Sequence, residues 1–319
     1  MSQSTKKLRI LRDILGEPFR VGKEHLYHCP KCNHHKKKLS VNLDKDKFKC
    51  WVCEYSGSSI YRLVRRLGNF KQQNEWQQFL GDKLVDLSSF DQVFTEALNW
   101  GAKKQEEKQV IPLPAEFVSL TSKNLPKSAY PAIKFLAQRG LSTEDVLKWK
   151  VGFCETGEYA NRVVFPSFDE QGSVNYFVAR AYDNSWKKYT NPPAKRNIIF
   201  NELYIDWKSD LSLVEGVFDA VVAGNAVPIL GSTLRADSRL FKQIVQHDTP
   251  VYVAMDADAE KKAMNLIKKL LTFDIELYKV DISPYSDVGE MSRGEYLERK
   301  KAAVPMTSQE YFSKSIAAI

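Results

Sequence analysis

Two pairs of cysteines near the N-terminus restrict the fold of this 319-residue chain more than any other feature. Each pair has CxxC spacing, as Cys29-Pro-Lys-Cys32 and as Cys50-Trp-Val-Cys53, and seventeen residues separate the two pairs. A CxxC turn places two sulfurs on one side of a knuckle, and a second knuckle completes the tetrahedral shell that suits zinc. Because four thiolates leave no coordination position open, the spacing predicts one structural zinc ion.

A pair of disulfides is the competing interpretation of these four cysteines. The N-terminal sequence is the basic, amphipathic MSQSTKKLRILRDIL rather than a secretory signal, and no apolar run is long enough to span a membrane. We therefore expect a cytoplasmic protein without a membrane partner, in which the cysteines hold metal. The fifth cysteine, Cys154, stands alone in an apolar context and is expected to be a small buried thiol.

The segment between the knuckles alternates as a β-hairpin does, with one apolar face and one lysine-rich face. Residues 39–43 and 47–49 alternate, and residues 44–46 are typical of the turn between them. A lysine face suits contacts with nucleic-acid phosphates. The candidate DNA-binding residues are Lys36, Lys37, Lys38, Lys47 and Lys49. Since four cysteines already satisfy the metal, the nearby histidines are expected at the surface: His28, His34 and His35.

Positive charge is concentrated in the first fifth of the chain. Residues 1–68 contain 16 Lys and Arg against 6 Asp and Glu, a formal charge of +10, whereas the remaining residues carry −2. This domain stays basic even when four zinc-bound thiolates are counted. Such a concentration is typical of nucleic-acid binding, although a solvated lysine surface has the same composition.

The second half of the chain alternates apolar strands with helices, which predicts a parallel α/β sheet. The strands are expected to begin at residues 211, 227, 251 and 275, with a lysine-rich helix over 260–271. Ligands of such sheets bind beyond the carboxyl ends of the strands, where Glu215, Asp256 and Asp258 fall. The Asp-x-Asp spacing points both side chains the same way. Hard carboxylate oxygens suit Mg²⁺.

The region between these features has a helical pair followed by basic strands. Helices are expected over 130–138 and 143–148, with Arg139-Gly140 closing the first and Ser142 capping the second. Strand-like segments with polar residues at regular positions follow. On composition alone, these basic residues would form a solvated face.

Several stretches resemble one family, the DNA primases of bacteria and bacteriophages. The cysteine knuckles with Gly57 and Ile60 resemble its zinc-binding domain, and YPAIKFLAQRGLSTEDVLKWKVGF resembles the opening of its RNA polymerase core. The segments NRVVFP, GSVNYFVAR and KYTNPP resemble its basic motifs. The resemblance implies that the residues contacting template or nucleotide are Asn161, Arg162, Arg180 and Lys188, with Lys195 on a looser alignment.

The acidic segments resemble the TOPRIM fold, which primases share with topoisomerases and some nucleases. The resemblance implies Glu215, Asp256 and Asp258 as catalytic residues and as Mg²⁺ ligands, with Asp219 and Asp287 as further ligands. Family members place three acids in a later turn. In this sequence Asp287 and Glu290 match and Gly289 stands at the middle position, so the number of catalytic metals stays open.

This resemblance implies an α/β protein, α+β overall, with a zinc ribbon, a basic subdomain and a parallel-sheet subdomain. The expected parts are a zinc-ribbon domain (1–68), a helical and charged linker (69–114), a basic subdomain (115–208), a TOPRIM subdomain (209–290) and a short C-terminal tail (291–319). Within the linker we expect helices around 75–80 and 90–99, and within the tail a helix around 294–303.

The implied function is DNA primase, a DNA-directed RNA polymerase that makes short RNA primers on single-stranded DNA for lagging-strand replication. It would use ribonucleoside triphosphates, catalytic Mg²⁺ or Mn²⁺ and one structural Zn²⁺. No phosphate-binding GxxxxGK[S/T] loop is present, so a separate hexameric replicative helicase is the implied partner. The all-cysteine ribbon and short tail favour the phage branch, similar to the primase of T-even phages, acting in a bacterial host's cytoplasm.

Two other classes of function remain. Another TOPRIM enzyme, a nuclease or topoisomerase, is possible, but the chain is short for a topoisomerase gate, and a nuclease leaves the ribbon and basic motifs unexplained. A non-catalytic zinc-ribbon DNA-binding protein is the other alternative. The retained acids Glu215, Asp256 and Asp258 argue against it.

Overall fold

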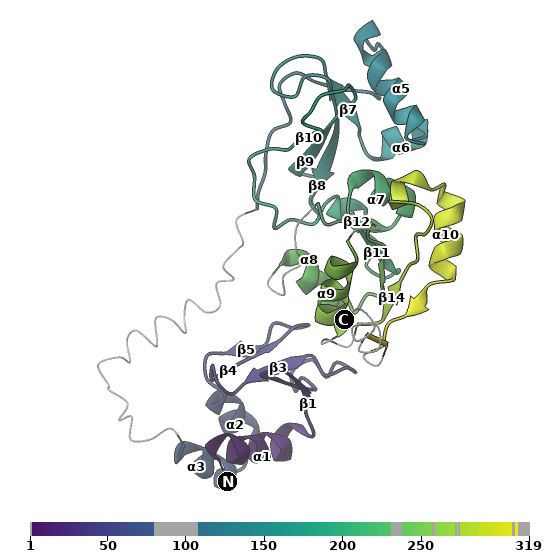
Figure 1. Ribbon diagram of the computed structural model, residues 1–319. Coiled ribbons are helices and arrows are strands. Elements are labelled where there is room, and N and C mark those ends of the chain that lie inside the picture. The colour runs from purple at the N-terminus through teal and green to yellow at the C-terminus, as the bar shows by residue number, and fades with distance from the viewer. Residues whose placement is uncertain are drawn as a thin grey trace. The chain divides into compact units, whose positions relative to one another are not determined.

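Two compact units, Met1–Lys108 and Gln109–Ile319, make up the chain in the computed structural model (Figure 1). The structure describes residues 2–79, 108–230, 238–256, 259–271, 273, 275–307 and 310–311. The helix expected around 90–99, the turn at 231–233 and Asp258 lie outside these residues. Among the helices described, none has both the length and the apolar composition needed to cross a membrane.

In its described residues, 2–79, the first unit is a five-stranded antiparallel sheet in the order β1-β2-β3-β4-β5, with three helices (Figure 1). The strands are β1 (Phe19–Val21), β2 (Glu24–Tyr27), β3 (Leu39–Asn42), β4 (Lys47–Cys50) and β5 (Ser56–Gly57). The helices are α1 (Gln3–Leu15), α2 (Tyr61–Leu67) and α3 (Phe70–Gln77). The predicted hairpin is confirmed as β3 and β4.

Residues beyond position 68 belong to this first unit. Helix α3 begins at Phe70, after an Asn69–Gln72 capping box, and its Trp76 is fully buried in the core that also holds Ile10 and Leu11 of α1. Helix α3 therefore packs in the core of the first unit, because its apolar face needs that core to cover it, and the boundary at 68 stays a prediction.

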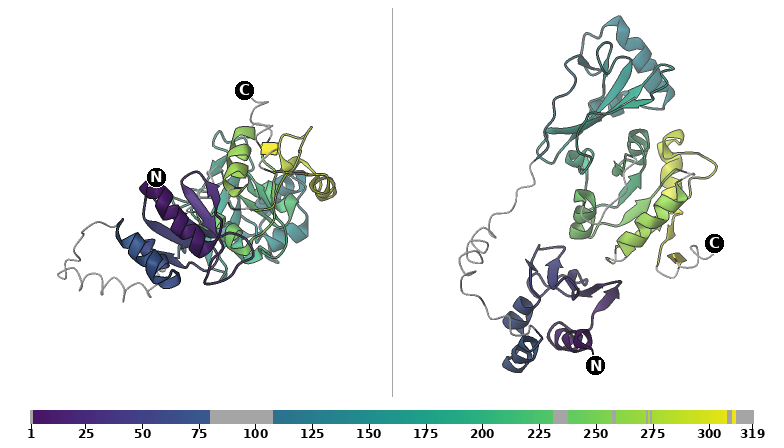
Figure 2. Two further views of the ribbon diagram at one scale, coloured as in Figure 1. Left: turned by 90° about the horizontal axis from the view of Figure 1, so that it is seen from below. Right: turned by 60° about the vertical axis from the view of Figure 1, so that its left-hand side comes forward.

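The second unit contains an antiparallel sheet and a parallel sheet, each with its own helices (Figure 2). The antiparallel sheet has the order β10-β9-β8-β7-β6. Its strands are β6 (Phe117–Ser119), β7 (Gly152–Cys154), β8 (Arg162–Phe168), β9 (Val174–Ala181) and β10 (Tyr189–Thr190). Helices α5 (Tyr130–Gln138) and α6 (Thr143–Lys148) have the predicted bounds, with Ser142 and Asp145 forming a capping box. Two 3₁₀ turns complete this part, η2 (Lys127–Ala129) and η3 (Glu202–Tyr204).

The parallel sheet predicted from the alternation of strands and helices is confirmed. Its order is β12-β11-β13-β14-β15, in which only the β14–β15 pair is antiparallel. Its strands are β11 (Leu211–Val214), β12 (Ala226–Pro228), β13 (Val251–Val253), β14 (Leu277–Lys279) and β15 (Val304–Pro305). Its helices are α7 (Val217–Ala223), α8 (Arg239–His247), α9 (Glu260–Leu271), η4 (Val288–Glu290) and α10 (Arg293–Lys301).

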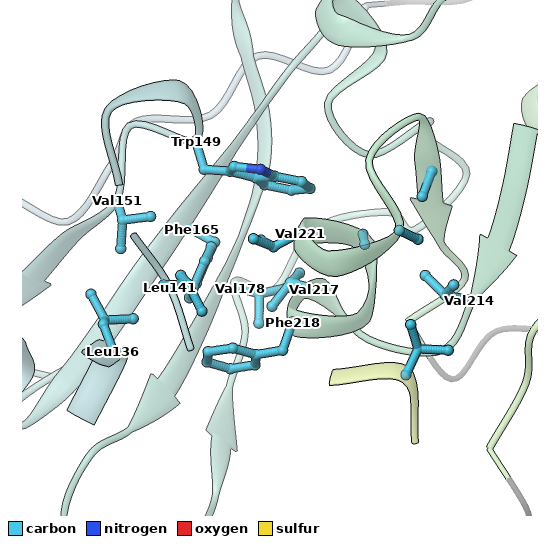
Figure 3. Packing of buried hydrophobic residues seen from close by; sticks show 14 of the residues in the cluster. Leu136, Leu141, Trp149, Val151, Phe165, Val178, Val214, Val217, Phe218 and Val221 are labelled. Carbon is cyan, nitrogen blue, oxygen red and sulfur yellow. The ribbon is translucent and has the colours of Figure 1, made fainter. Parts of the chain in front are cut away.

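One hydrophobic core joins the two sheets of this unit. Figure 3 shows Val217, Phe218 and Val221 of α7 pointing toward Trp149 and Phe165. The rings of Phe165 and Phe218 lie 5.2 Å apart between centroids, at 71°. Burying these aromatic side chains against each other makes the two subdomains one folded body.

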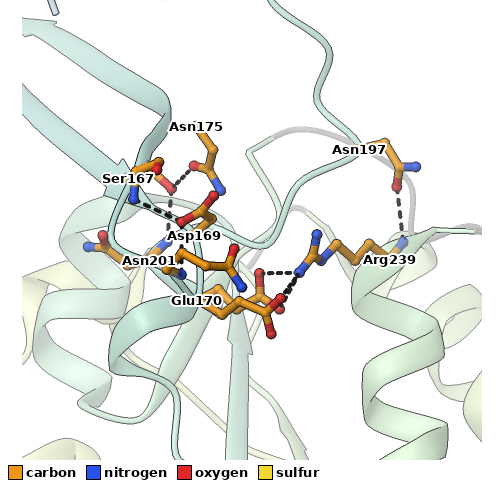
Figure 4. Close-up of polar contacts among 10 residues, drawn as sticks. Ser167, Asp169, Glu170, Asn175, Asn197, Asn201 and Arg239 are labelled. Carbon is orange, nitrogen blue, oxygen red and sulfur yellow. Dashed lines mark hydrogen bonds and ion pairs between the residues drawn. The ribbon is translucent and has the colours of Figure 1, made fainter. Parts of the chain in front are cut away.

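Polar contacts also tie α8 to the antiparallel part of the unit. Arg239, the first residue of α8, forms ion pairs with Glu170 and with the buried Glu202, and its backbone N–H donates to Asn197 Oδ1 (Figure 4). Burial raises the pKa of Glu202, and the Arg239 guanidinium opposes that rise. The ion pair thus compensates a carboxylate that has been taken out of water.

The C-terminal segment is part of the parallel sheet rather than a tail. Tyr296 of α10 is fully buried, and its hydroxyl donates to Ser212 Oγ of β11 at 2.7 Å. Strand β15 extends the same sheet along β14. Residues as far as Met306, which is also buried, therefore pack with this sheet, and the boundary at 290 stays a prediction.

Candidate functional site

The four predicted cysteines converge on one site. Cys29 follows β2, Cys50 ends β4, and their partners come from the following knuckle turns. The Sγ atoms of Cys29 and Cys53 are 3.7 Å apart, those of Cys32 and Cys50 are 3.8 Å apart, and all four lie within 4.8 Å of one another. A tetrahedral zinc shell with Zn–S bonds of about 2.3 Å needs S···S distances of about 3.8 Å. The geometry therefore fits one zinc ion.

The lysines of the hairpin differ in their exposure. Lys47 is exposed and Lys49 partly exposed, and their register with Asn42 and Ser40 puts them on the face opposite the buried Phe48. Lys36 and Lys37 are partly exposed, and Lys37 Nζ donates to Glu17 O. Lys38 was expected to contact phosphates, and this was wrong, because its side chain is fully buried. Its backbone carbonyl accepts a hydrogen bond from the Trp51 N–H at the second knuckle.

In the second unit, Asp219 links the first acidic strand end to the later acidic turn. Its Oδ2 accepts from the Gly216 N–H at 2.7 Å, and its Oδ1 accepts from the Gly289 N–H at 2.8 Å. Gly216 precedes α7, whereas Gly289 lies in η4, seventy residues after Asp219. Each carboxylate oxygen of Asp219 thus accepts a hydrogen bond from a backbone N–H group.

This arrangement concentrates negative charge in a partly buried place. The pKa of Asp219 rises to about 6, first because of burial and then because of the nearby Asp287 and Glu215, while the two backbone N–H groups oppose the rise. Carboxylates that raise one another's pKa are stabilised by a bound cation. Among the residues that the structure describes, however, no three of these acids bring one oxygen each within 4.8 Å of one another, so the acids concentrate charge without forming a closed ligand shell.

Two of the other acids, Asp287 and Glu215, lie within electrostatic range of Asp219. Asp287 is half-buried, and its Oδ1 accepts no hydrogen bond from the residues that the structure describes. The pKa of Asp287 is raised by burial and then by Glu290, and Arg139 opposes this. Asp256 follows β13, which pairs in parallel with β11, so Asp256 and Glu215 both lie beyond carboxyl ends of neighbouring strands. The Oδ1 of Asp287, which accepts no hydrogen bond from the described residues, is the kind of oxygen that a hard cation takes as a ligand.

Two basic residues at this site were missed by the sequence reasoning. Lys262 of α9 places its Nζ 3.2 Å from Glu215 Oε1, with both side chains mostly buried. Arg139, after α5, stacks over Phe218 with its Cζ 5.5 Å from the ring centroid and lowers the pKa of Asp287 and Glu290 electrostatically. Arg139 stood in the QRGLS stretch, whereas nothing in the sequence singled Lys262 out from neighbouring lysines.

The predicted basic residues divide between the two faces of the antiparallel sheet. Arg180 pairs with Val163 and Tyr189, so these three share a face, and the Arg180 Cζ lies 4.8 Å from the Tyr189 ring centroid. Desolvation raises the pKa of Tyr189, Arg180 opposes this, and Asp219 and Asp287 raise it further. This face therefore lies within electrostatic range of the acids.

Arg162 lies on the opposite face, because it pairs with Cys154 and Ala181. Its guanidinium donates to Ala160 O at 2.6 Å and to Lys187 O at 3.4 Å. The side chains of Asn161, Lys188 and Lys195 are exposed. The strand register thus puts Arg180 and Arg162, both expected to contact template or nucleotide, on opposite faces of the sheet.

The chain is similar in sequence to several known DNA primases. No family model matches the chain. The DNA primase of Clostridium acetobutylicum is 25% identical over 87% of this chain and 54% of the relative, and that of Campylobacter jejuni is 23% identical over 80% and 48%. The chain thus spans about half the length of the curated relatives it matches. The zinc-binding and RNA polymerase domains of the Aquifex aeolicus primase align with 94% of this chain and 84% of that one, at 21% identity and a TM-score of 0.47. In sequence, the chain is similar to curated DNA primases at 25% identity or less.

Proposed function

We propose that this chain is a DNA primase that makes short RNA primers on single-stranded DNA from ribonucleoside triphosphates. The carboxylates around Asp219 carry the proposal, since Glu215 and Asp256 lie beyond the carboxyl ends of parallel strands and Asp219 and Asp287 lie within electrostatic range of Tyr189. Phosphoryl transfer needs positioning and charge stabilisation more than a protein nucleophile. Sequence relatives that are DNA primases support this choice of chemistry.

The acids would hold Mg²⁺ or Mn²⁺. Glu215, Asp256 and Asp287 are the candidate ligands among the described residues, and Asp258 is a further candidate from the sequence. When bound, the cation would supply charge neutralisation to the triphosphate and to the attacking 3′-hydroxyl. Asp219 would position the other acids, because both of its oxygens already accept backbone N–H groups.

The basic residues would bind the polyanions. Arg180 lies against Tyr189, which is within electrostatic range of Asp219 and Asp287, and its planar guanidinium suits phosphate oxygens of the incoming nucleotide. Asn161, Lys188 and Lys195 are exposed and available to the template or the nucleotide. Arg162 would instead support the β9–β10 hairpin through its bond to Lys187 O.

The first unit would bind template DNA around one structural zinc. Burial raises the pKa of the Cys29 and Cys50 thiols, so a bound cation is what would stabilise them as thiolates. Lys36, Lys37, Lys47 and Lys49 would contact phosphates. A separate hexameric helicase as partner, a phage origin near the T-even primases and action in a bacterial host's cytoplasm complete the proposal.

Primer synthesis from ribonucleotides on single-stranded DNA tests this function. Wild type with Mg²⁺ should make short RNA, and Asp256→Asn should make none while binding DNA normally. Asp281→Asn, which changes an exposed acid outside the cluster, is the matched control and should stay active. Equal activity in wild type and Asp256→Asn would refute the site. Cleavage of the DNA without RNA synthesis would identify a nuclease instead.

A further inference from the structure

A tryptophan stands almost fully in solvent at the tip of the β9–β10 hairpin. Trp186 is 93% exposed, more than any other large hydrophobic residue in the described chain; Phe70 follows at 78% and Tyr130 at 69%. Tryptophan normally buries a large apolar surface on folding. Leaving Trp186 outside contributes nothing to the core, so the side chain is free to serve a ligand.

The hairpin that carries Trp186 is internally braced. Asp183 Oδ1 accepts from the Ser185 N–H at 3.1 Å and from the Ser185 hydroxyl, and these contacts lower the pKa of Asp183. The Ala181 N–H donates to Lys188 O at 2.9 Å, and Arg162 donates to Lys187 O. A braced turn holds the indole out at low entropic cost on binding.

Positive charge adjoins the indole on its C-terminal side. Lys187 and Lys188 follow directly and are exposed. An aromatic plane next to cationic side chains is the combination that binds single-stranded nucleic acid, since bases stack on the ring while lysines contact the phosphates. A double helix offers no free base face to such a ring.

The same hairpin continues into β10, whose first residue is Tyr189. Tyr189, three residues beyond Trp186, pairs with Arg180 and is within electrostatic range of Asp219 and Asp287. We propose that Trp186 stacks on an unpaired base of the single-stranded DNA template while Lys187 and Lys188 contact its phosphates. This inference rests on the proposed primase function and adds a template contact to it.

Stacking on a base face is tolerant of sequence. Trp186 would therefore strengthen template binding about equally on oligonucleotides of different sequence, leaving start-site choice to other residues. The lysines would make the binding weaken as salt rises.

Binding of fluorescently labelled single-stranded DNA to the full chain tests the inference. Trp186→Ala should weaken binding by about 5- to 150-fold, and Trp186→Phe, which keeps a ring, should restore most of the affinity. Tyr130→Ala, at an exposed aromatic of α5 in the same unit, is the matched control and should bind as wild type does. A normally folded Trp186→Ala with wild-type affinity would overturn the inference. So would a Phe variant as weak as the Ala variant, or an equal loss of duplex binding.

Fluorescence separates this inference from the proposed function. The emission difference between wild type and Trp186→Phe isolates one of the six tryptophans, and single-stranded DNA should quench it. If wild type makes primers but this signal does not respond to DNA, the stacking contact is refuted and the function stands. If the signal is quenched but no primer is made, the DNA contact stands and the primase proposal falls.

Discussion

Asp219 and Gly289 are joined by a hydrogen bond of 2.8 Å from the backbone N–H of Gly289 to Oδ1 of Asp219. Seventy residues separate them in the chain. A Cβ on residue 289 would lie 3.1 Å from Asp219 Oδ1, 3.2 Å from Asp287 Oδ1 and 3.3 Å from Phe218 Cβ. Glycine therefore fits at a position where the family was expected to carry an acid. Because residue 289 has no side chain, the carboxylates of Asp219 and Asp287 can approach the turn.

Gly289→Ala should disturb the acidic cluster. Three contacts at 3.1–3.3 Å require the turn to move by a few tenths of an ångström, and small misplacements at a site that positions reactants are costly. We expect a loss of roughly tenfold or more in primer synthesis and weaker Mn²⁺ binding by calorimetry. Gly294→Ala is the matched control, since its new Cβ would lie 3.9 Å from Ser292 Oγ, and it should be at least as stable as wild type. Wild-type Mn²⁺ affinity in Gly289→Ala would contradict this view of the turn.

The pH dependence of stability should report the buried Asp219. Its folded pKa of about 6 lies above the ordinary 3.8, so between these values the folded chain binds more protons than the unfolded chain. The free energy of unfolding contributed by this group therefore falls as pH rises through that window. Relative to Asp219→Asn, wild type should gain about 1 kcal/mol on going from pH 8 to pH 5.

Urea unfolding at several pH values measures this difference. The only divalent cation present in these samples should be zinc. Asp281→Asn serves for comparison, because a backbone hydrogen bond from Ser283 lowers the pKa of Asp281 and its stabilisation is lost only at more acidic pH. If the free energy of unfolding of wild type relative to Asp219→Asn instead increased with pH, the pKa of Asp219 would not be raised in the folded chain.

Lys262→Met should strengthen divalent cation binding. The Lys262 ammonium lies 3.2 Å from Glu215 Oε1, so a cation that takes Glu215 as a ligand must displace it. An ion pair of this exposure is worth at most about 1 kcal/mol, which corresponds to an increase in Mn²⁺ affinity of up to about fivefold. Lys261→Met, at the exposed neighbouring position, should leave the affinity unchanged. A lower affinity in Lys262→Met would mean that the lysine helps to hold the site together.

Loss of one knuckle cysteine should release zinc and unfold the first unit. Cys50→Ser removes a buried ligand from a four-sulfur shell, and metal binding of this kind contributes on the order of 10 kcal/mol to folding. Elemental analysis should find one zinc per chain in wild type and none in the variant, whose residues 1–108 should become sensitive to protease.

Cys154→Ser is the control for that experiment. Cys154 is buried in the second unit, and burial raises its pKa to about 12, so it is a poor metal ligand and a poor nucleophile. The variant should keep its zinc. Full zinc content in Cys50→Ser would exclude the four-cysteine site.

Local patterns predicted the elements that depend on near neighbours. The capping residue Ser142 and the apolar spacing beyond it predicted α6 with its correct bounds, and the CxxC spacing predicted where four sulfurs meet. The alternation of strands and helices predicted a parallel sheet with Glu215 and Asp256 at strand ends. These features hold because hydrogen bonding within a turn and side-chain periodicity are properties of a short segment.

Contacts between distant segments could not be predicted in this way. Nothing near Lys38 indicated that its side chain is buried, and nothing near Tyr296 indicated its hydrogen bond to Ser212 across the sheet. The opposite faces of Arg162 and Arg180 follow from strand register, which pairing partners fix.

The sequence by itself determined the ligand types, the strand ends that carry the acids and the basic character of the first unit. Only the tertiary structure decided that Asp219 accepts the backbone N–H groups of both Gly216 and Gly289. The same holds for the ion pair of Lys262 with Glu215 and for the packing of α10 on the parallel sheet. The physical reason is that charge pairing and burial depend on distance in space, and residues seventy positions apart become neighbours only when the core has formed.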